Sequence, residues 1–110
     1  MSILTSVKKV LGIAEEYMNF DADLIMHINS VFFILNQLGI GVDGFSIEDE
    51  GAQWTDFLSD ESKMQLVKSY VYLKVRLLFD PPQSSAVMDC IKNQISEYEW
   101  RLNVKAENNE

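Results

Sequence analysis

Few side chains of this sequence have the chemistry needed for catalysis or metal binding. His27 is the only histidine and Cys90 the only cysteine among 110 residues. One histidine supplies neither a metal-binding cluster nor a cysteine–histidine nucleophile pair without further partners. We therefore interpret His27 as structural or solvent-facing. We expect Cys90, which has no partner for an internal disulfide, to be a buried thiol.

The remaining polar residues do not form a catalytic pattern. Acidic neighbours such as Glu97 and Glu99 are spaced so that they do not share a helix face, which is typical of solvated charge. Gly39, Gly41 and Gly44 are spaced like a flexible loop, and the chain has no GxxxxGK(S/T), GxGxxG or GxSxG motif. An all-helical enzyme that binds small dianions is the enzymatic alternative. Such pockets use several convergent cations, whereas this chain has two arginines.

Charge and composition favour a single globular domain that does not grip nucleic acid. Hydrophobic residues make up 47% and charged residues 24% of the chain, which is typical of a folded domain, and its length suits one cooperative unit. The formal net charge of −8 disfavours binding to a phosphate backbone, which draws on clustered Lys and Arg. An acidic surface can nevertheless surround DNA without holding it.

No stretch of the sequence is long enough to cross a membrane. The longest apolar run, residues 31–35, is far shorter than the roughly 20 residues that a spanning helix needs. Residues 1–12 lack the apolar core of a signal peptide. We therefore expect a cytosolic protein.

Apolar residues at helical spacing predict an all-α fold, a small helical bundle of about four helices with a long loop between the second and the third. The loop at residues 39–53 has glycines, an acidic cluster and room for one brief strand. Pro81 and Pro82 end the third helix, because proline cannot donate the next hydrogen bond. The predicted elements are a short helix from Ser2 or Thr5 to Gly12, a helix from an N-cap at Asp21 to Leu38, one turn at residues 54–58, a helix from Ser59 or Asp60 to Phe79, and a helix from Ser84 or Ser85 beyond Leu102.

Two of these helices carry more apolar surface than one core face needs. The segment KSYVYLKVRLLFDPP, residues 68–82, leaves only a thin polar stripe, and a helix that is apolar on most sides is buried on most sides. Met26 and Trp100 also lie off the core stripes of their helices, and with Phe33 and Ile34 they would form a patch that requires a partner. We predict subunit contacts at Met26, Phe33, Ile34, Lys68 and Arg76. For Lys68 and Arg76, ion pairs within the chain or simple solvation are the alternative.

The third and fourth helices carry the motifs of a known family. The segment KSYVYLKVRLLFDPPQSSAVMDCIKNQISEYEWRLN contains a long helix that ends in an FDPP turn, and then a helix that ends in EWRLN. Upstream, FDADLIMHINSVFFILNQLGIG and the loop FSIEDE followed by WTDFL have the matching order and spacing. Over residues 3–104 the chain resembles the head-tail connector, or adaptor, proteins of long-tailed bacteriophages and prophages, which are often described as DNA-packaging proteins.

The resemblance implies a structural protein of the virion and no enzyme activity. It implies a homo-oligomeric ring of about twelve copies, whose subunit can be a monomer in solution, with no cofactor and no membrane. The ring would dock beneath the portal protein, let DNA pass without specific binding, and offer its far side to a downstream connector or tail-completion protein. We expect the subunit to be made in the cytoplasm of the bacterial host and to lie at the head-tail joint. The alternative is a cytosolic helical protein-binding module unrelated to virions.

Two segments without apolar periodicity are the candidates for contacts with the neighbouring proteins. We expect residues 1–104 to form the connector domain and residues 105–110 a flexible tail. Such segments recover their ordering entropy from a partner. In the family that the chain resembles, the C-terminal segment tends to reach toward the portal. The resemblance therefore places portal contacts at Arg101, Asn103, Lys105 and Glu107, and tail-side or lumen contacts at Phe45, Ile47, Glu48, Asp49 and Glu50.

Overall fold

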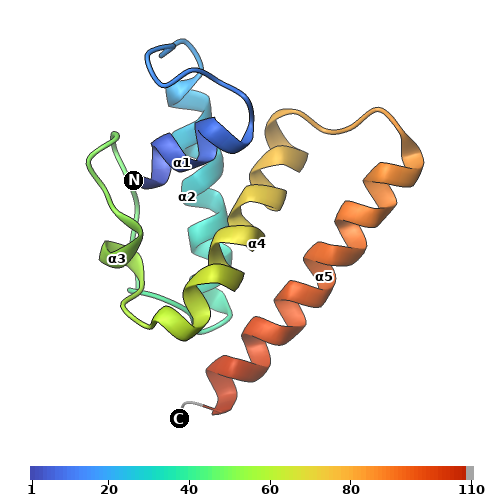
Figure 1. The fold of residues 1–110 in the computed structure, drawn as a ribbon. Coiled ribbons are helices and arrows are strands. Elements are labelled where there is room, and N and C mark those ends of the chain that lie inside the picture. Colours follow the sequence, from blue (N-terminus) through green and yellow to red (C-terminus); the bar gives the residue numbers. More distant parts are fainter. Residues whose placement is uncertain (109–110) are drawn as a thin grey trace.

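Five helices make up the fold of the residues that the structure describes (Figure 1). The structure is a computed structural model that describes residues 1–108, apart from the side chains of residues 105, 107 and 108. The helices are α1 (Ile3–Val10), α2 (Asp21–Gln37), α3 (Trp54–Phe57), α4 (Glu61–Phe79) and α5 (Ser85–Asn108). The described residues contain no strand, only an isolated antiparallel bridge between Ser2 and Gln53. The prediction of a small all-α bundle is confirmed.

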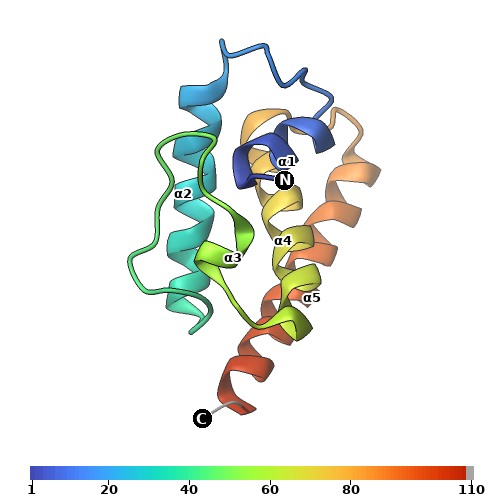
Figure 2. The same cartoon turned by 60° about the vertical axis from the view of Figure 1, so that its left-hand side comes forward.

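α4 is the central helix of the bundle. It packs against α2 on one side and α5 on the other, and both neighbours run antiparallel to it (Figures 1 and 2). α1, α3 and the loop that leads to α3 lie in front of α2 and α4 in Figure 2. The molecule is flattened, with principal extents of 41, 36 and 19 Å. The apolar surplus of α4 is thus largely covered by two helices of its own chain.

The start of each helix depends on a local or a distant polar contact. At α1 the Ser2 hydroxyl accepts a hydrogen bond from the Thr5 amide at 3.1 Å, as expected of an N-cap. At α2 the predicted N-cap at Asp21 is wrong, because Phe20 occupies the cap position and Asp21 is the first helical residue. The Asp21 carboxylate instead pairs with Lys8 of α1.

The turn between α4 and α5 reverses the chain, and α4 ends before Pro81 and Pro82, as predicted. Asp80 follows the last residue of α4, and the Ser84 hydroxyl accepts a hydrogen bond from the Val87 amide at 3.3 Å at the start of α5. α5 then continues to Asn108, four residues beyond the expected boundary at residue 104. Residues 109 and 110 of the predicted tail lie outside the described residues.

One expectation about α5 is wrong. Cys90, expected as a buried thiol, is exposed. For the first core position of the helix, Met88 is half-buried whereas Val87 is exposed. Ile95 and Leu102 are buried, as their spacing predicts.

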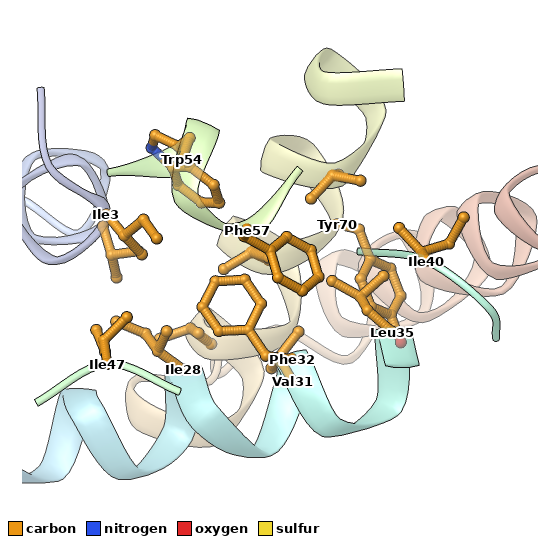
Figure 3. Packing of buried hydrophobic residues seen from close by; sticks show 14 of the residues in the cluster. Ile3, Ile28, Val31, Phe32, Leu35, Ile40, Ile47, Trp54, Phe57 and Tyr70 are labelled. Atoms are coloured by element: carbon orange, nitrogen blue, oxygen red, sulfur yellow. The ribbon is translucent and has the colours of Figure 1, made fainter. Parts of the chain in front are cut away.

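Aromatic side chains from α2, α3 and the intervening loop form the centre of the core (Figure 3). The ring centroid of Phe32 lies 4.4 Å from that of Phe57 and 5.2 Å from that of Phe45. Trp54 is edge-on to Phe32, with 6.3 Å between the centroids. Aromatic pairs in such tilted geometries stabilise a core beyond the area that they bury.

Two asparagines of α2 hold the loop against the helix. The Asn29 amide nitrogen donates to the Ile47 carbonyl at 3.0 Å, and its amide oxygen accepts from the Ile47 N–H at 2.8 Å. About two helical turns later, the Asn36 side chain donates to the Val42 carbonyl at 3.0 Å and accepts from the Gly44 N–H at 3.1 Å. These side chains supply the partners that a neighbouring strand would otherwise give the loop backbone.

Candidate interaction surfaces

An exposed apolar stripe runs along α2. Met26 is 57% exposed and Phe33 is 63% exposed. With the exposed Ser30 and Gln37 they repeat at intervals of three or four residues, so the four share one helix face. We call this face the α2 stripe (Met26, Ser30, Phe33 and Gln37). Two of the predicted contact residues, Met26 and Phe33, therefore lie on one surface.

The other three predicted subunit contacts lie elsewhere. Ile34 is half-buried and packs against the core. The Lys68 ammonium lies 5.7 Å from the centroid of the Trp54 ring, a cation–π contact within the chain. Arg76 is exposed on α4. None of the three belongs to the α2 stripe.

A small hollow adjoins the C-terminal end of the α2 stripe. Its volume is about 180 Å³, and its walls are Phe33, Asn36, Gln37, Asp43 and Gly44. The amide of Asn36 bonds the backbone of the loop, which keeps the loop wall of the hollow in place. An aromatic ring beside a carboxylate can receive a large side chain that has one hydrogen-bond donor.

The outer face of α5 carries one large exposed apolar residue. Trp100 is 65% exposed and lies on the side of the helix opposite the buried Ile95 and Leu102. Asn93 and Ser96 are exposed on the same side. We call this face the α5 stripe (Asn93, Ser96 and Trp100).

The expected single patch of Met26, Phe33, Ile34 and Trp100 is wrong. Met26 and Phe33 belong to α2 and Trp100 belongs to α5, and each of the two stripes faces away from the buried side of its own helix. Met26 and Phe33 therefore lie on a different surface from Trp100, because periodicity within one helix cannot show how two helices are turned relative to each other.

The predicted portal contacts lie on the last turns of α5. Arg101 and Asn103 are exposed. The Arg101 guanidinium donates to the Glu97 carboxylate at 3.0 Å, and both side chains are about half exposed, so this pair stabilises the helix little. The side chains of Lys105 and Glu107 lie outside the described residues.

The predicted tail-side or lumen loop is divided between core and solvent. Ile47 is 3% exposed and Phe45 is half-buried, so both apolar side chains pack inside their own chain. Glu48, Asp49 and Glu50 are exposed and line a groove of about 490 Å³. Residues 45–50 of the loop thus present their carboxylates, and not their two apolar side chains, to solvent.

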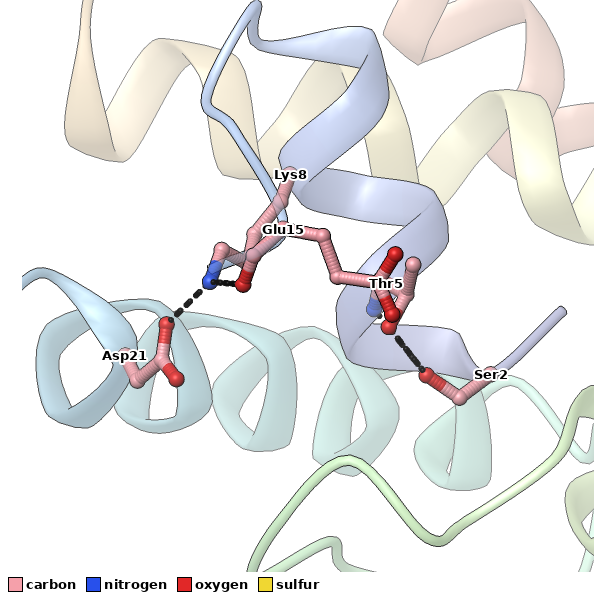
Figure 4. Close-up of polar contacts among 5 residues, drawn as sticks. All are labelled: Ser2, Thr5, Lys8, Glu15 and Asp21. Atoms are coloured by element: carbon pink, nitrogen blue, oxygen red, sulfur yellow. Dashed lines mark hydrogen bonds and ion pairs between the residues drawn. The ribbon is translucent and has the colours of Figure 1, made fainter. Parts of the chain in front are cut away.

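A buried ion pair joins α1 to the start of α2 (Figure 4). The Lys8 ammonium lies 2.9 Å from a carboxylate oxygen of Asp21 and donates to the backbone carbonyl of Glu15 at 2.8 Å. Only 3% of the Lys8 side chain is exposed. The sequence prediction missed this residue, although Lys8 follows Leu4 by four positions and therefore shares the buried face of α1.

A second buried polar contact joins α4 to α5. The hydroxyl of the buried Tyr70 donates to a Glu99 carboxylate oxygen at 2.6 Å, and the Lys74 ammonium lies 3.8 Å from the same oxygen. Burial raises the pKa of the Tyr70 phenol well above its ordinary value of 10.0, and the hydrogen bond to Glu99 and the charge of Glu99 raise it further. The expectation that Glu97 and Glu99 are only solvated is wrong, since Glu97 pairs with Arg101 and Glu99 with Tyr70.

The raised pKa of Tyr70 predicts a loss of stability in alkali. The folded protein holds the phenolic proton more tightly than the unfolded chain does. The stabilisation is therefore complete below about pH 10 and is lost progressively as the pH rises from there toward the raised pKa. Tyr70→Phe should remove this part of the pH dependence, which urea unfolding midpoints at about pH 8 and about pH 11 would measure.

The pH dependence that remains in Tyr70→Phe has to be compared with that of the unmodified protein. Tyr72 also has a pKa raised by burial, so some alkaline destabilisation should persist in Tyr70→Phe. An equal fall of the midpoint in the unmodified protein and in Tyr70→Phe would contradict the assignment.

The described side chains fit a protein that assembles with other proteins. Among the residues that the structure describes, no three His, Cys, Asp or Glu side chains are grouped so that they could hold a metal ion. A search of the described helices found none with the length and apolar character of a membrane span. The buried polar contacts join elements of one chain, and the exposed features include the α2 stripe, the α5 stripe and an acidic loop.

Comparison with known families identifies the class more closely. The model of the family described as phage connector protein matches residues 3–109, nearly the whole chain. The chain belongs to this family, as its sequence motifs indicated. No significant match was found among curated proteins or solved structures. Membership gives the chain a structural connector role as a component of a phage virion, among other head and tail proteins, and not an enzymatic one.

Proposed function

We propose that this chain is the subunit of a ring that lies between the capsid portal and the tail and extends the channel for double-stranded DNA. The family match over residues 3–109 is the observation that carries this proposal. A subunit in such a position needs separate surfaces for its neighbours in the ring and for the proteins above and below it. Two apolar stripes, the end of α5 and an acidic loop are available for these contacts.

The charge of the chain supports a passive role toward DNA. The net charge is −8, and the exposed carboxylates at residues 48–50 would repel a phosphate backbone. We place this loop at the lumen or on the tail side of the ring. DNA would then pass without adhering to the wall, and no cofactor or DNA-binding site is required.

We propose that the C-terminal end of α5 contacts the portal. This end lies at one extremity of the molecule, far from the turn that joins α4 to α5 (Figure 1). An end-on contact there leaves the sides of α2 and α5 free for neighbouring subunits. Arg101 and Asn103 are the described polar side chains that this end offers.

The proposed function is tested with the full chain and portal rings of the virus that encodes it. Sedimentation should show the chain bound to the portals, and electron microscopy should show an additional ring. In the virus, deletion of the gene should leave heads that do not join tails. Undecorated portals together with heads that still join tails would instead favour the alternative, a cytosolic protein-binding module.

The double variant Arg101→Ala, Asn103→Ala should weaken portal binding about tenfold, equivalent to about 1.4 kcal/mol. Stability should be unchanged, because both side chains are exposed and the pair with Glu97 is solvated. Quantitative sedimentation of variant and portal measures the loss. Lys92→Ala with Gln65→Ala removes an exposed cation and an exposed amide elsewhere, and should bind normally. Equal binding by both double variants would remove the end of α5 as the portal contact.

A further inference from the structure

We infer that neighbouring subunits of the ring meet head to tail, with the α5 stripe of one copy against the α2 stripe of the next. Trp100 of one copy would fill the hollow beside Phe33 on its neighbour. This inference rests on the proposed ring. It goes further by naming the two surfaces that form the repeated contact and by explaining how this contact closes the ring.

The two stripes carry Met26, Phe33 and Trp100, three of the most exposed large apolar side chains on the helices that the structure describes. Trp100 lies opposite the buried Ile95 and Leu102 on α5, and Phe33 lies nearly opposite the buried Ile28 and Leu35 on α2. α2 and α5 pack on two sides of α4 (Figures 1 and 2). Phe33 and Trp100 each face away from the buried side of their helix, so a single copy cannot place its own Trp100 on its own Phe33. A second copy can.

The two surfaces have complementary shapes, one with a projecting side chain and the other with a hollow. Trp100 is a single large projection among small polar side chains, whereas the end of the α2 stripe is a hollow of about 180 Å³ with an exposed aromatic wall. The indole N–H is a donor without acceptor capacity, and Asp43, a residue with an acceptor side chain, is one of the residues that line the hollow. Tryptophan side chains that enter such pockets are frequent energetic centres of protein interfaces.

The register of the helices sets both stripes at the same level along the bundle. A Cβ atom on Gly39 would lie 3.3 Å from the Cβ of Ala106, so the end of α2 meets α5 at this point. Phe33 and Trp100 each precede that contact by six residues, on helices that run in the same direction. Six residues span about 9 Å along a helix. Phe33 and Trp100 are therefore at nearly equal height.

The equal height of Phe33 and Trp100 determines whether the repeated contact gives a closed ring or a filament. A contact between two different surfaces of the same chain is heterologous, and it gives a closed ring when the operation is a rotation without a shift, and a filament when a shift is present. Joining Trp100 of one copy to Phe33 of the next requires almost no shift along the helices. The stripes thus fit a ring whose axis lies between the directions of α2 and α5, which are inclined to each other in Figure 1.

Cross-linking on decorated portals tests the pairing. Ser30 of the α2 stripe and Ser96 of the α5 stripe are exposed and nearly level, and each can be replaced by cysteine in a Cys90→Ser background. With a short bismaleimide, the double variant Ser30→Cys, Ser96→Cys should give a ladder of bands from dimer up to the whole ring. A mixture of the two single variants should give cross-linked species that contain both, and each single variant alone should stay monomeric. The matched pair Gln65→Cys, Ser96→Cys, which combines α5 with the exposed side of α4, should give no ladder.

The outcomes separate the inference from the function on which it rests. Portals that remain undecorated would overturn the proposed function, and the inference with it. Decorated portals without a ladder would overturn the inference alone. Dimers from Ser30→Cys alone or from Ser96→Cys alone would show like surfaces in contact, and would also overturn it. As a second measurement, Trp100→Ala should lower the number of chains per portal at least tenfold at equal protein concentration, whereas Leu78→Ala, at an exposed apolar residue of α4, should not.

Discussion

Replacing Gly41 with alanine is expected to lower the free energy of unfolding by about 3 kcal/mol, because two separate costs add. The φ angle of Gly41 is +82°, a left-handed conformation that costs an L residue about 1 kcal/mol. The added Cβ would also lie 2.2 Å from the ring of Phe57. Phe57 is wholly buried, with its centroid 4.4 Å from that of Phe32, so the ring cannot move without repacking the core. Overpacking of this kind costs roughly 1–3 kcal/mol.

The matched control for this prediction is Gly44→Ala. Gly44 has a φ of +75°, but a Cβ there would meet no atom within 4 Å. Its expected loss is therefore the backbone cost alone, about 1 kcal/mol. Urea unfolding of the two variants, compared by midpoint at constant slope, measures the difference. Equal losses would show that the Phe57 ring yields freely and that the contact with Gly41 does not limit the fold.

The limits of most elements could be predicted because their signals are local. Ser2 bonds an amide three residues later, and Pro81 and Pro82 cannot continue a helix whatever surrounds them. The start of α2 could not be predicted in the same way. Asp21 is favourable both as a cap and in the first turn, and Lys8, on another helix, decides where its carboxylate points.

The candidate surfaces show the same division between local and distant causes. Met26 and Phe33 could be predicted to be exposed because helical periodicity separates the faces of one helix. The burial of Ile47 could not, because its loop has no periodicity and is held by Asn29, a residue 18 positions away. The relation of Trp100 to Phe33 depends on how α2 and α5 pack on α4. Residue spacing within either helix carries no information on that relation.

Replacing Lys8 with methionine is expected to destabilise the protein by about 3 kcal/mol. Methionine fills a similar volume, but it leaves the Asp21 carboxylate and the Glu15 carbonyl without the ammonium that both now contact. Breaking a buried pair by removing one partner is more costly than losing the pair, because the remaining charge stays desolvated. Lys9→Met removes the neighbouring, exposed lysine and should change stability by no more than about 0.5 kcal/mol.

The double variant Lys8→Met, Asp21→Asn decides whether the pair itself is responsible. If the loss in Lys8→Met comes from the unpaired carboxylate, neutralising Asp21 should restore part of it, and the two substitutions should couple by about 1 kcal/mol or more. Simple additivity would instead show that Lys8 matters through the packing of its aliphatic stem. α1 packs on both α2 and α4. Coupling would show that the ion pair between Lys8 and Asp21 fixes α1 against the start of α2. The ion pair would then serve to fix the position of α2, the helix that carries Met26 and Phe33, in spite of the free-energy cost of desolvating Lys8.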